Sequence, residues 1–173
     1  MATQDTNLTD AANRIQAGEE MGAVLGVSET QLQAIAALGY NKYQQGRLED
    51  AETMFRGVAA LDTKSYFGYA GLGAIALAKR PPDLEAALTN LSKAAELKPE
   101  DATIQANLGE VLLRQGKLDQ AKSHLEKAFQ LDPGHKEASV NRARAIVSGL
   151  DVVVKEAERL TEAKTTKGRG KVS

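Results

Sequence analysis

The sequence has no cysteine and no tryptophan, and aromatic residues make up only 4% of its 173 positions. Without cysteine the chain cannot form disulfides, ligate a metal through thiolate or use a cysteine nucleophile. It also lacks an apolar run of the roughly 20 residues that a membrane-spanning helix requires, so we expect no stable membrane insertion. The first residues, MATQDTNLTDAANRIQ, do not combine a basic start with an apolar run, and we expect no secretory signal there.

Net charge and histidine content are low. The formal net charge is −1 at pH 7, which gives the whole chain no electrostatic attraction for nucleic acid. The two histidines, His124 and His135, have no nucleophile or metal-ligand partner at a useful spacing, and we interpret both as surface residues. The sequence therefore predicts no enzyme, no cofactor and no nucleic-acid partner.

What the sequence does have is a repeated helical pattern. Residues 102–135 combine a leucine–glycine pair in a first helix with a glycine turn and small residues in a second helix. The positions concerned are Leu108, Gly109, Gly116, Ala121, Leu125, Ala128 and Pro133. This pattern of about 34 residues is typical of the tetratricopeptide repeat, a helix–turn–helix unit.

Two earlier segments carry the same pattern, which predicts an all-α fold. We expect a tetratricopeptide-repeat superhelix of three repeats, at 32–65, 66–101 and 102–135. Residues 1–31 are predicted to hold an apolar helix and the lead into the first repeat. Residues 136–163 are predicted to form C-terminal capping helices, the last of them over about 151–163. The basic end, 164–173, is predicted to be disordered and to serve solubility.

Small residues are expected where the two helices of a repeat touch most closely, because a larger side chain would push the helices apart. These residues are Gly39, Gly73 and Gly109 in the first helices and Ala51, Ala87 and Ala121 in the second. Upstream, the sequence SETQ (Ser28 to Gln31) predicts a capping box and a helix that starts near Glu29.

The first helix of the first repeat carries two tyrosines, Tyr40 and Tyr43. At about 100° per residue, one side of this helix is expected to face the partner helices; it holds Ile35, Leu38, Gly39 and Lys42. The other side and its equivalents in the next repeats are expected to line the inner, concave surface: Gln33, Ala36, Tyr40, Tyr43, Phe67, Ala70, Ala74, Leu77, Thr103, Ala106, Glu110 and Leu113. Such an apolar, small-sided groove suits an extended peptide with bulky side chains. The alternative is that the two tyrosine rings pack in the core.

The segment from Ala36 to Ala74 resembles the class II chaperones of bacterial type III secretion, which guard hydrophobic translocator proteins. The matching residues are Tyr40, Tyr43, Gly46, Glu49, Ala51, Phe55, Leu61, Asp62 and the run Gly71-Leu72-Gly73-Ala74. The upstream stretch EEMGAVLGVSETQLQ is similar to that family's short apolar helix and serine-capped lead into the first repeat. The resemblance extends over about residues 19–78, beyond which only the general repeat pattern is shared.

This resemblance implies a small cytoplasmic chaperone. Its groove would hold an extended, proline- and leucine-containing segment of a secreted hydrophobic client, with Ala36, Tyr40 and Tyr43 among the groove residues. An N-terminal apolar patch of Met21, Val24 and Leu25 would help to form a homodimer.

Two other kinds of binding module share this repeat pattern. A general tetratricopeptide-repeat scaffold or adaptor in another bacterial secretion or envelope assembly stays open, since the third repeat is close to the general consensus. A carboxylate clamp, which grips an acidic C-terminal tail with lysine, asparagine and arginine on the inner helices, is not favoured. The sequence has Ala36, Tyr40, Gly71, Thr103 and Asn107 at those places.

Overall fold

The computed structural model describes the backbone of residues 2–169 and the side chains of residues 8–156, 158 and 159. This part of the chain forms helices and turns without a strand. The helices are α1 (Ala2–Gln16), α2 (Met21–Val24), α3 (Glu29–Gln44), α4 (Leu48–Leu61), α5 (Tyr66–Ala78), α6 (Leu84–Leu97), α7 (Ala102–Arg114), α8 (Leu118–Leu131) and α9 (Ala138–Arg169). Among the described residues, no helix has the length and hydropathy of a membrane span.

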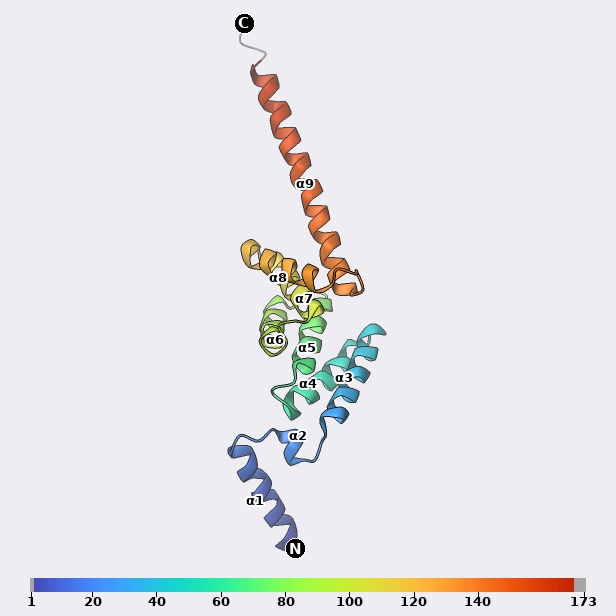
Figure 1. Cartoon of the computed structure of the whole chain (residues 1–173), viewed down its shortest axis with the longest axis vertical. Coiled ribbons are helices and arrows are strands. Elements are labelled where there is room, and N and C mark those ends of the chain that lie inside the picture. Colours follow the sequence, from blue (N-terminus) through green and yellow to red (C-terminus); the bar gives the residue numbers. More distant parts are fainter. Residues whose placement is uncertain (1, 170–173) are drawn as a thin grey trace.

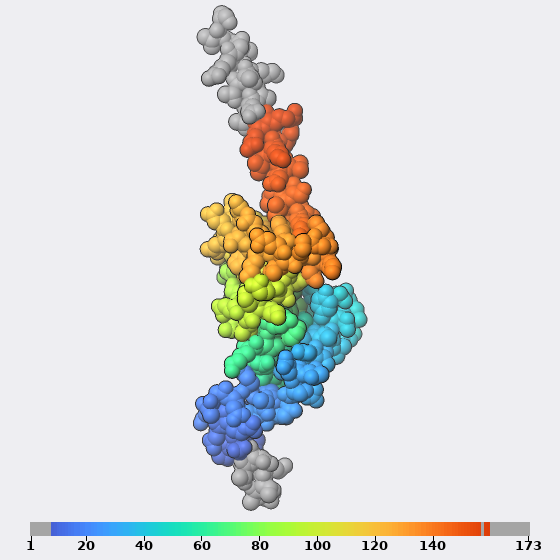
Figure 2. All heavy atoms as spheres, in the orientation of Figure 1, coloured from blue at the N-terminus to red at the C-terminus, as the bar shows by residue number. Residues whose placement is uncertain are grey.

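The middle of the molecule is a stack of three helix pairs, α3 with α4, α5 with α6 and α7 with α8 (Figure 1). The predicted all-α tetratricopeptide superhelix is therefore confirmed. The molecule is elongated (Figures 1 and 2), and the backbone of α1 and the far end of α9 lie at opposite ends of the stack (Figure 1).

Small residues allow the paired helices to approach closely, as the sequence predicted. A Cβ added to Gly73 would lie 2.5 Å from Cγ of Leu91, and one added to Gly109 would lie 2.6 Å from Leu125. The facing alanines of the second helices, Ala51, Ala87 and Ala121, are fully buried. Leu38, which was expected to face the partner helices, is instead 47% exposed, so the contact face of α3 is narrower than predicted.

The start of α3 is fixed by the predicted capping box. The Ser28 hydroxyl accepts a hydrogen bond from the Gln31 backbone N–H at 3.2 Å, and the Ser28 N–H donates to the Gln31 side chain at 2.8 Å. These bonds satisfy donors that a helix start leaves unpaired.

The N-terminal segment forms two helices, not one. Gly18, with φ +90°, lies in the left-handed region between α1 and α2, where most side chains are strained. The short helix α2 packs on α4, because Gly22 lets its backbone come close to the Leu61 carbonyl. The Glu20 carboxylate accepts a 2.8 Å hydrogen bond from the Thr63 N–H, which anchors the same segment to the turn after α4.

The C-terminal segment is one long helix, which corrects the prediction of separate capping helices and a disordered tail. The first turns of α9 cap the stack, with Val140 and Ala143 buried against α7 and α8. Val147 still packs on this cluster, residues 148–156 are exposed, and the rest of the helix leaves the body (Figure 1). No proline interrupts it, and Gly149 alone costs only about 1 kcal/mol in a helix interior. The backbone stays helical to Arg169, whereas disorder was predicted from residue 164. Residues 170–173 of the predicted tail lie outside the described residues.

Candidate binding groove

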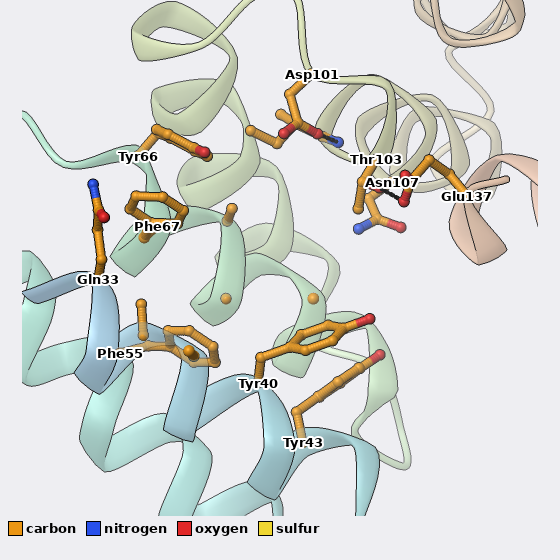
Figure 3. Close-up of a pocket in the computed structure, with 16 residues that line it drawn as sticks. Gln33, Tyr40, Tyr43, Phe55, Tyr66, Phe67, Asp101, Thr103, Asn107 and Glu137 are labelled. Carbon is orange, nitrogen blue, oxygen red and sulfur yellow. Dashed lines mark hydrogen bonds between the residues drawn. The ribbon is translucent and has the colours of Figure 1, made fainter. Parts of the chain in front are cut away.

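A pocket of about 470 Å³ lies between the first helices of the three repeats. Figure 3 shows side chains of α3 on one side of this pocket and side chains of α5 and α7 on the other. Its lining residues are Gln33, Ala36, Ala37, Tyr40, Tyr43, Phe55, Tyr66, Phe67, Ala70, Gly71, Ala74, Asp101, Thr103, Ile104, Asn107 and Glu137. The volume falls in the range of pockets that hold small ligands or a few side chains.

Aromatic rings stand at two places on this wall. Tyr40 and Tyr43 on α3 are stacked with ring centroids 6.3 Å apart, and Tyr66 and Phe67 on α5 are stacked at 4.1 Å. Figure 3 shows the first pair side by side and the second pair across the pocket from it. Such rings offer large, rigid contact area at a low cost in side-chain entropy.

Small residues keep the floor of the pocket open. Ala70, Gly71 and Ala74 follow one another along α5, and the buried ring of Phe55 lies directly against Gly71. A Cβ at Gly71 would overlap that ring. The space beside α5 therefore depends on the absence of side chains as much as on the rings.

The α7 side of the pocket is polar and acidic. Asp101 caps α7 by accepting a 3.0 Å hydrogen bond from the Ile104 N–H, and Thr103 donates to the Glu137 carboxylate at 3.1 Å. The lining of this pocket includes two carboxylates and no cation. The inner wall is thus less apolar at the third repeat than the sequence predicted.

Most of the predicted groove residues come together in this pocket. Those that line it are Gln33, Ala36, Tyr40, Tyr43, Phe67, Ala70, Ala74 and Thr103. Tyr40 is 54% exposed, whereas Tyr43 is half-buried and packs against the core cluster of Ala36 and Phe55. The alternative of core packing therefore applies in part to Tyr43 and not to Tyr40.

Two predicted positions belong to the core. Ala106 is 1% exposed and packs with Leu125, Val140 and Ala143, because the start of α9 occupies the space where a further repeat would stack. Leu113 likewise packs against core clusters and lines neither pocket. Both predictions of a groove position are wrong.

Leu77 and Glu110 line a second pocket that adjoins the first. Leu77 is almost buried and belongs to the core cluster between α5 and α7. Glu110 is 3% exposed, and its carboxylate accepts hydrogen bonds from Arg114 at 2.7 Å and from Arg142 of α9 at 2.8 Å. Instead of the expected apolar wall, this place holds a buried carboxylate paired with two half-exposed arginines, which the repeat pattern did not indicate.

Sequence reasoning missed several lining residues, notably Phe55, Tyr66, Gly71 and Glu137. Phe55 was expected only as a residue that matches the chaperone family and not as a groove residue, yet it lines the pocket. The signal for it was Gly71, because a second glycine two residues before Gly73 indicates another close approach to α5.

His124 is not the surface residue that we predicted. Its Nδ1 lies 2.7 Å from the Gln105 side-chain oxygen, and the Gln105 amide nitrogen donates to the Pro99 carbonyl at 2.9 Å. Nδ1 must therefore carry the proton in this bond. Burial, with a smaller effect of Lys127, lowers the pKa of His124. In the part of the chain described, no three histidine or carboxylate side chains are grouped to hold a metal.

The N-terminal apolar patch lies apart from the groove, beside the first repeat. Met21 is 42% and Leu25 is 63% exposed, and Val24 is half-buried. Ile15 of α1, 40% exposed, adds to the apolar surface of this end.

Comparison with known proteins first defines the class of protein. Family models described as "TPR repeat" and "Tetratricopeptide repeat" match residues 83–116 and 102–135. DnaJ homolog subfamily C member 3 of Bos taurus is 29% identical over 127 residues, and the chain spans only a quarter of its length. The chain is a tetratricopeptide-repeat protein.

More specific relatives come from type III secretion. Low calcium response locus protein H of Yersinia pseudotuberculosis is 30% identical over 72% of this chain and 75% of its own length. PcrH from Pseudomonas aeruginosa is 30% identical with a TM-score of 0.58, over 72% of this chain and 94% of that one. The translocator chaperone SycD of Yersinia enterocolitica shares the fold at 24% identity, with a TM-score of 0.61 over 76% and 98% of the chains. This chain belongs to the family of type III secretion translocator chaperones.

Proposed function

We propose that this protein is a chaperone that holds an extended hydrophobic segment of a secreted translocator protein in the groove between α3, α5 and α7. The observation that carries the proposal is the exposed ring of Tyr40 beside a pocket floored by Ala70, Gly71 and Ala74. In support, PcrH has been crystallised with the chaperone binding regions of PopB and PopD, and SycD with a peptide of the translocator YopD.

The mechanism is occupancy. Each apolar client side chain that enters the pocket is removed from water, which favours binding by about 25 cal/mol for each Å² of apolar surface buried. While it is bound it cannot associate with other apolar surfaces, so the client is kept from premature aggregation. No bond is made or broken, and we propose no catalytic activity. Because a client must be held before it is exported, we propose that the protein acts in the cytoplasm.

We also propose that the protein forms a homodimer through Met21, Val24 and Leu25. Apolar side chains that are both exposed and held in place by a packed segment suit a protein interface. In support, the related SycD has been crystallised as an alternative dimer.

Fluorescence anisotropy with three labelled peptides tests the chaperone proposal. The peptides are the chaperone binding regions of PopB and PopD and the YopD peptide. We expect saturable binding of at least one, weakened by Ala70→Leu, which fills the floor of the pocket. Tyr69→Ala, an aromatic change on the same helix away from the pocket lining, is the control and should bind normally. If the folded protein binds none of the three, or if Ala70→Leu binds as well as the control, the proposal is wrong.

A further inference from the structure

A second pocket of about 430 Å³ continues the groove beyond Tyr43, which lines both cavities. The second pocket lies at the C-terminal ends of α5 and α7, and α9 contributes Arg142 to its lining. Its lining residues are Tyr43, Leu77, Ala78, Lys79, Arg80, Pro81, Pro82, Glu110, Arg114 and Arg142. An extended chain bound beside Tyr40 and Tyr43 would therefore have this cavity as its next neighbour.

The charge of this pocket is strongly one-sided. Its lining contains four cations and a single carboxylate, Glu110. That carboxylate is shared by Arg114 and Arg142, so the cluster of these three groups keeps one positive charge. Lys79 is paired at 2.9 Å with Glu52, but Arg80 has no ion pair or hydrogen bond within the described residues. Two positive charges are left without an anion.

The arginines also have donors to offer. Arg114 uses one terminal nitrogen on Glu110, and Arg142 uses Nε on Glu110 and one terminal nitrogen on Asn107. A guanidinium has five N–H groups, and both side chains are nearly half-exposed, so further N–H groups remain free for a ligand. Planar guanidinium donors suit a carboxylate, and such charge-assisted hydrogen bonds are stronger than neutral ones.

The opposite sign prevails in the first pocket. Asp101 and Glu137 line it and no cation is among its lining residues, while the second pocket carries the excess of arginine and lysine. The groove thus runs from an acidic end, past the aromatic rings, to a basic end. A ligand with a matching charge pattern gains at both ends, and a reversed ligand is repelled.

We infer that the second pocket receives an acidic side chain of the client segment, so that the groove selects for a carboxylate placed next to the apolar residues held at Tyr40 and Tyr43. This inference rests on the proposed function and deepens it. The cations come from the α5–α6 turn, the end of α7 and α9, and not from positions 36, 40, 71, 103 and 107, where a carboxylate clamp would have them. The competing explanation is that these cations only stabilise the negative C-terminal ends of α5 and α7.

A glutamate scan of a bound peptide tests the inference. The probe is whichever of the PopB, PopD or YopD peptides binds, remade with every acidic residue as glutamine and then with one glutamate moved along it. We expect one glutamate position to tighten binding by about threefold to tenfold at low salt, and the gain to fade at high salt. Arg80→Gln and Arg114→Gln should each reduce this gain, which is measured within each variant as the ratio of its affinities for the glutamate peptide and the neutral peptide.

The control is Arg159→Gln, the same change at a 72% exposed arginine of α9 that lines neither pocket. It should keep the full gain from glutamate. If no glutamate position tightens binding, or if the gain persists in both pocket variants, the second pocket is not an acidic subsite. If the neutral peptide still binds in that case, the proposed chaperone function stands. If only the original acidic peptide binds and the neutral peptide does not, charge and not the apolar groove holds the client, and the proposed function is wrong.

Discussion

Tyr40 and Tyr43 are only three residues apart on α3, but they contact different surroundings. Tyr40 is 54% exposed and stacks on the ring of Tyr43. Tyr43 also packs on the core around Phe55 and lines both pockets. The ring of Tyr40 is therefore mostly available to a ligand, whereas the ring of Tyr43 connects the groove to the core.

Replacing each tyrosine by alanine should separate these roles. Tyr40→Ala is expected to weaken peptide binding by about tenfold, as for an aromatic interface residue, and to change the free energy of unfolding by less than about 0.5 kcal/mol. Tyr43→Ala should weaken binding and also lower the unfolding free energy by about 1–3 kcal/mol, since a partly buried ring is lost. Urea denaturation and anisotropy measure the two quantities. A large stability loss with normal binding in Tyr40→Ala would make that ring a core residue.

Replacing two helical glycines, Gly71 and Gly57, by alanine should change the stability of the protein in opposite directions. At Gly71 a Cβ would overlap the Phe55 ring, so Gly71→Ala is expected to destabilise the protein by about 1–3 kcal/mol and to weaken peptide binding by displacing a pocket ring. At Gly57, also inside a helix, nothing lies within 4 Å of an added Cβ, and Gly57→Ala should stabilise by about 0.5–1 kcal/mol. Thermal unfolding of both variants measures this difference. A gain of stability in both would contradict the prediction, because it would mean that the Phe55 ring can move aside without loss of stability.

At this scale the sequence predicted well wherever the repeat itself fixes the geometry. Gln33, Ala36 and Tyr40 share a side of one helix, and they reach the pocket together. Ala106 occupies the equivalent place on α7 but faces α9, because the last repeat has no repeat after it. Helical spacing shows which side chains of a helix share a face, but it does not show which other element packs against that face.

Among the elements, the junction between α8 and α9 depends on one carboxylate. Asp132 is 5% exposed and follows the end of α8, where it accepts hydrogen bonds from the backbone N–H groups of Lys136 and Glu137 at 2.9 and 3.0 Å. Arg144 of α9 donates to the Asp132 carbonyl at 2.6 Å. These contacts hold α9 against the last repeat, and the bond from the Glu137 N–H also positions Glu137, which lines the first pocket.

Acid should weaken this junction. The backbone N–H of Lys136 is the main cause that lowers the pKa of Asp132 from its ordinary value of 3.8, with Glu137 and Arg144 adding to it. A lowered pKa in the folded state means that the carboxylate stabilises the protein fully above about pH 3.8, and that this contribution disappears as the pH falls through the folded pKa. Asp132→Asn should therefore be less stable than the wild type at pH 7, with a difference that shrinks at low pH.

The measurement is the free energy of unfolding between pH 7 and the acid limit. The matched control is Asp151→Asn, which removes an exposed α9 carboxylate with no hydrogen bond or ion pair in the described part of the chain. It should follow the wild-type profile. A constant deficit of Asp132→Asn at every pH would mean that its ionisation has no part in holding α9.

The elements outside the repeats were the least predictable. The sequence indicated the apolar stretch around Val24, but the break at Gly18 and the docking of Gly22 on Leu61 depend on a contact 39 residues further along the chain. The continuity of α9 is hidden for a different reason. The basic, glycine-containing composition of the last residues is typical of disorder, whereas the helix propensity of the residues before them favours a helix. No tertiary contact is predicted there that would favour one of the two states.

At the scale of the whole molecule, the groove and the N-terminal patch are separate surfaces on one rigid stack. The Glu20 carboxylate, bonded to Thr63, and Gly22, packed on Leu61, fix the N-terminal segment to the first repeat. Met21 and Leu25 are therefore presented in a defined position, although they are largely exposed. A fixed apolar patch can pair with its own copy and leave the groove of each protomer open to a client.

Sedimentation velocity at micromolar concentration tests this arrangement. The wild type is expected to be a dimer, and both Leu25→Asp and deletion of residues 1–26 should shift it to monomer, because a buried unpaired charge or the loss of the apolar contact removes the interface. Leu118→Asp, the same change at a 64% exposed leucine on α8, should leave the dimer intact. Since no residue of the patch lines either pocket, monomeric Leu25→Asp should still bind peptide. A monomeric wild type, or a Leu25→Asp variant and a deletion that both remain dimeric, would remove the N-terminal patch as the interface while the groove argument would stand.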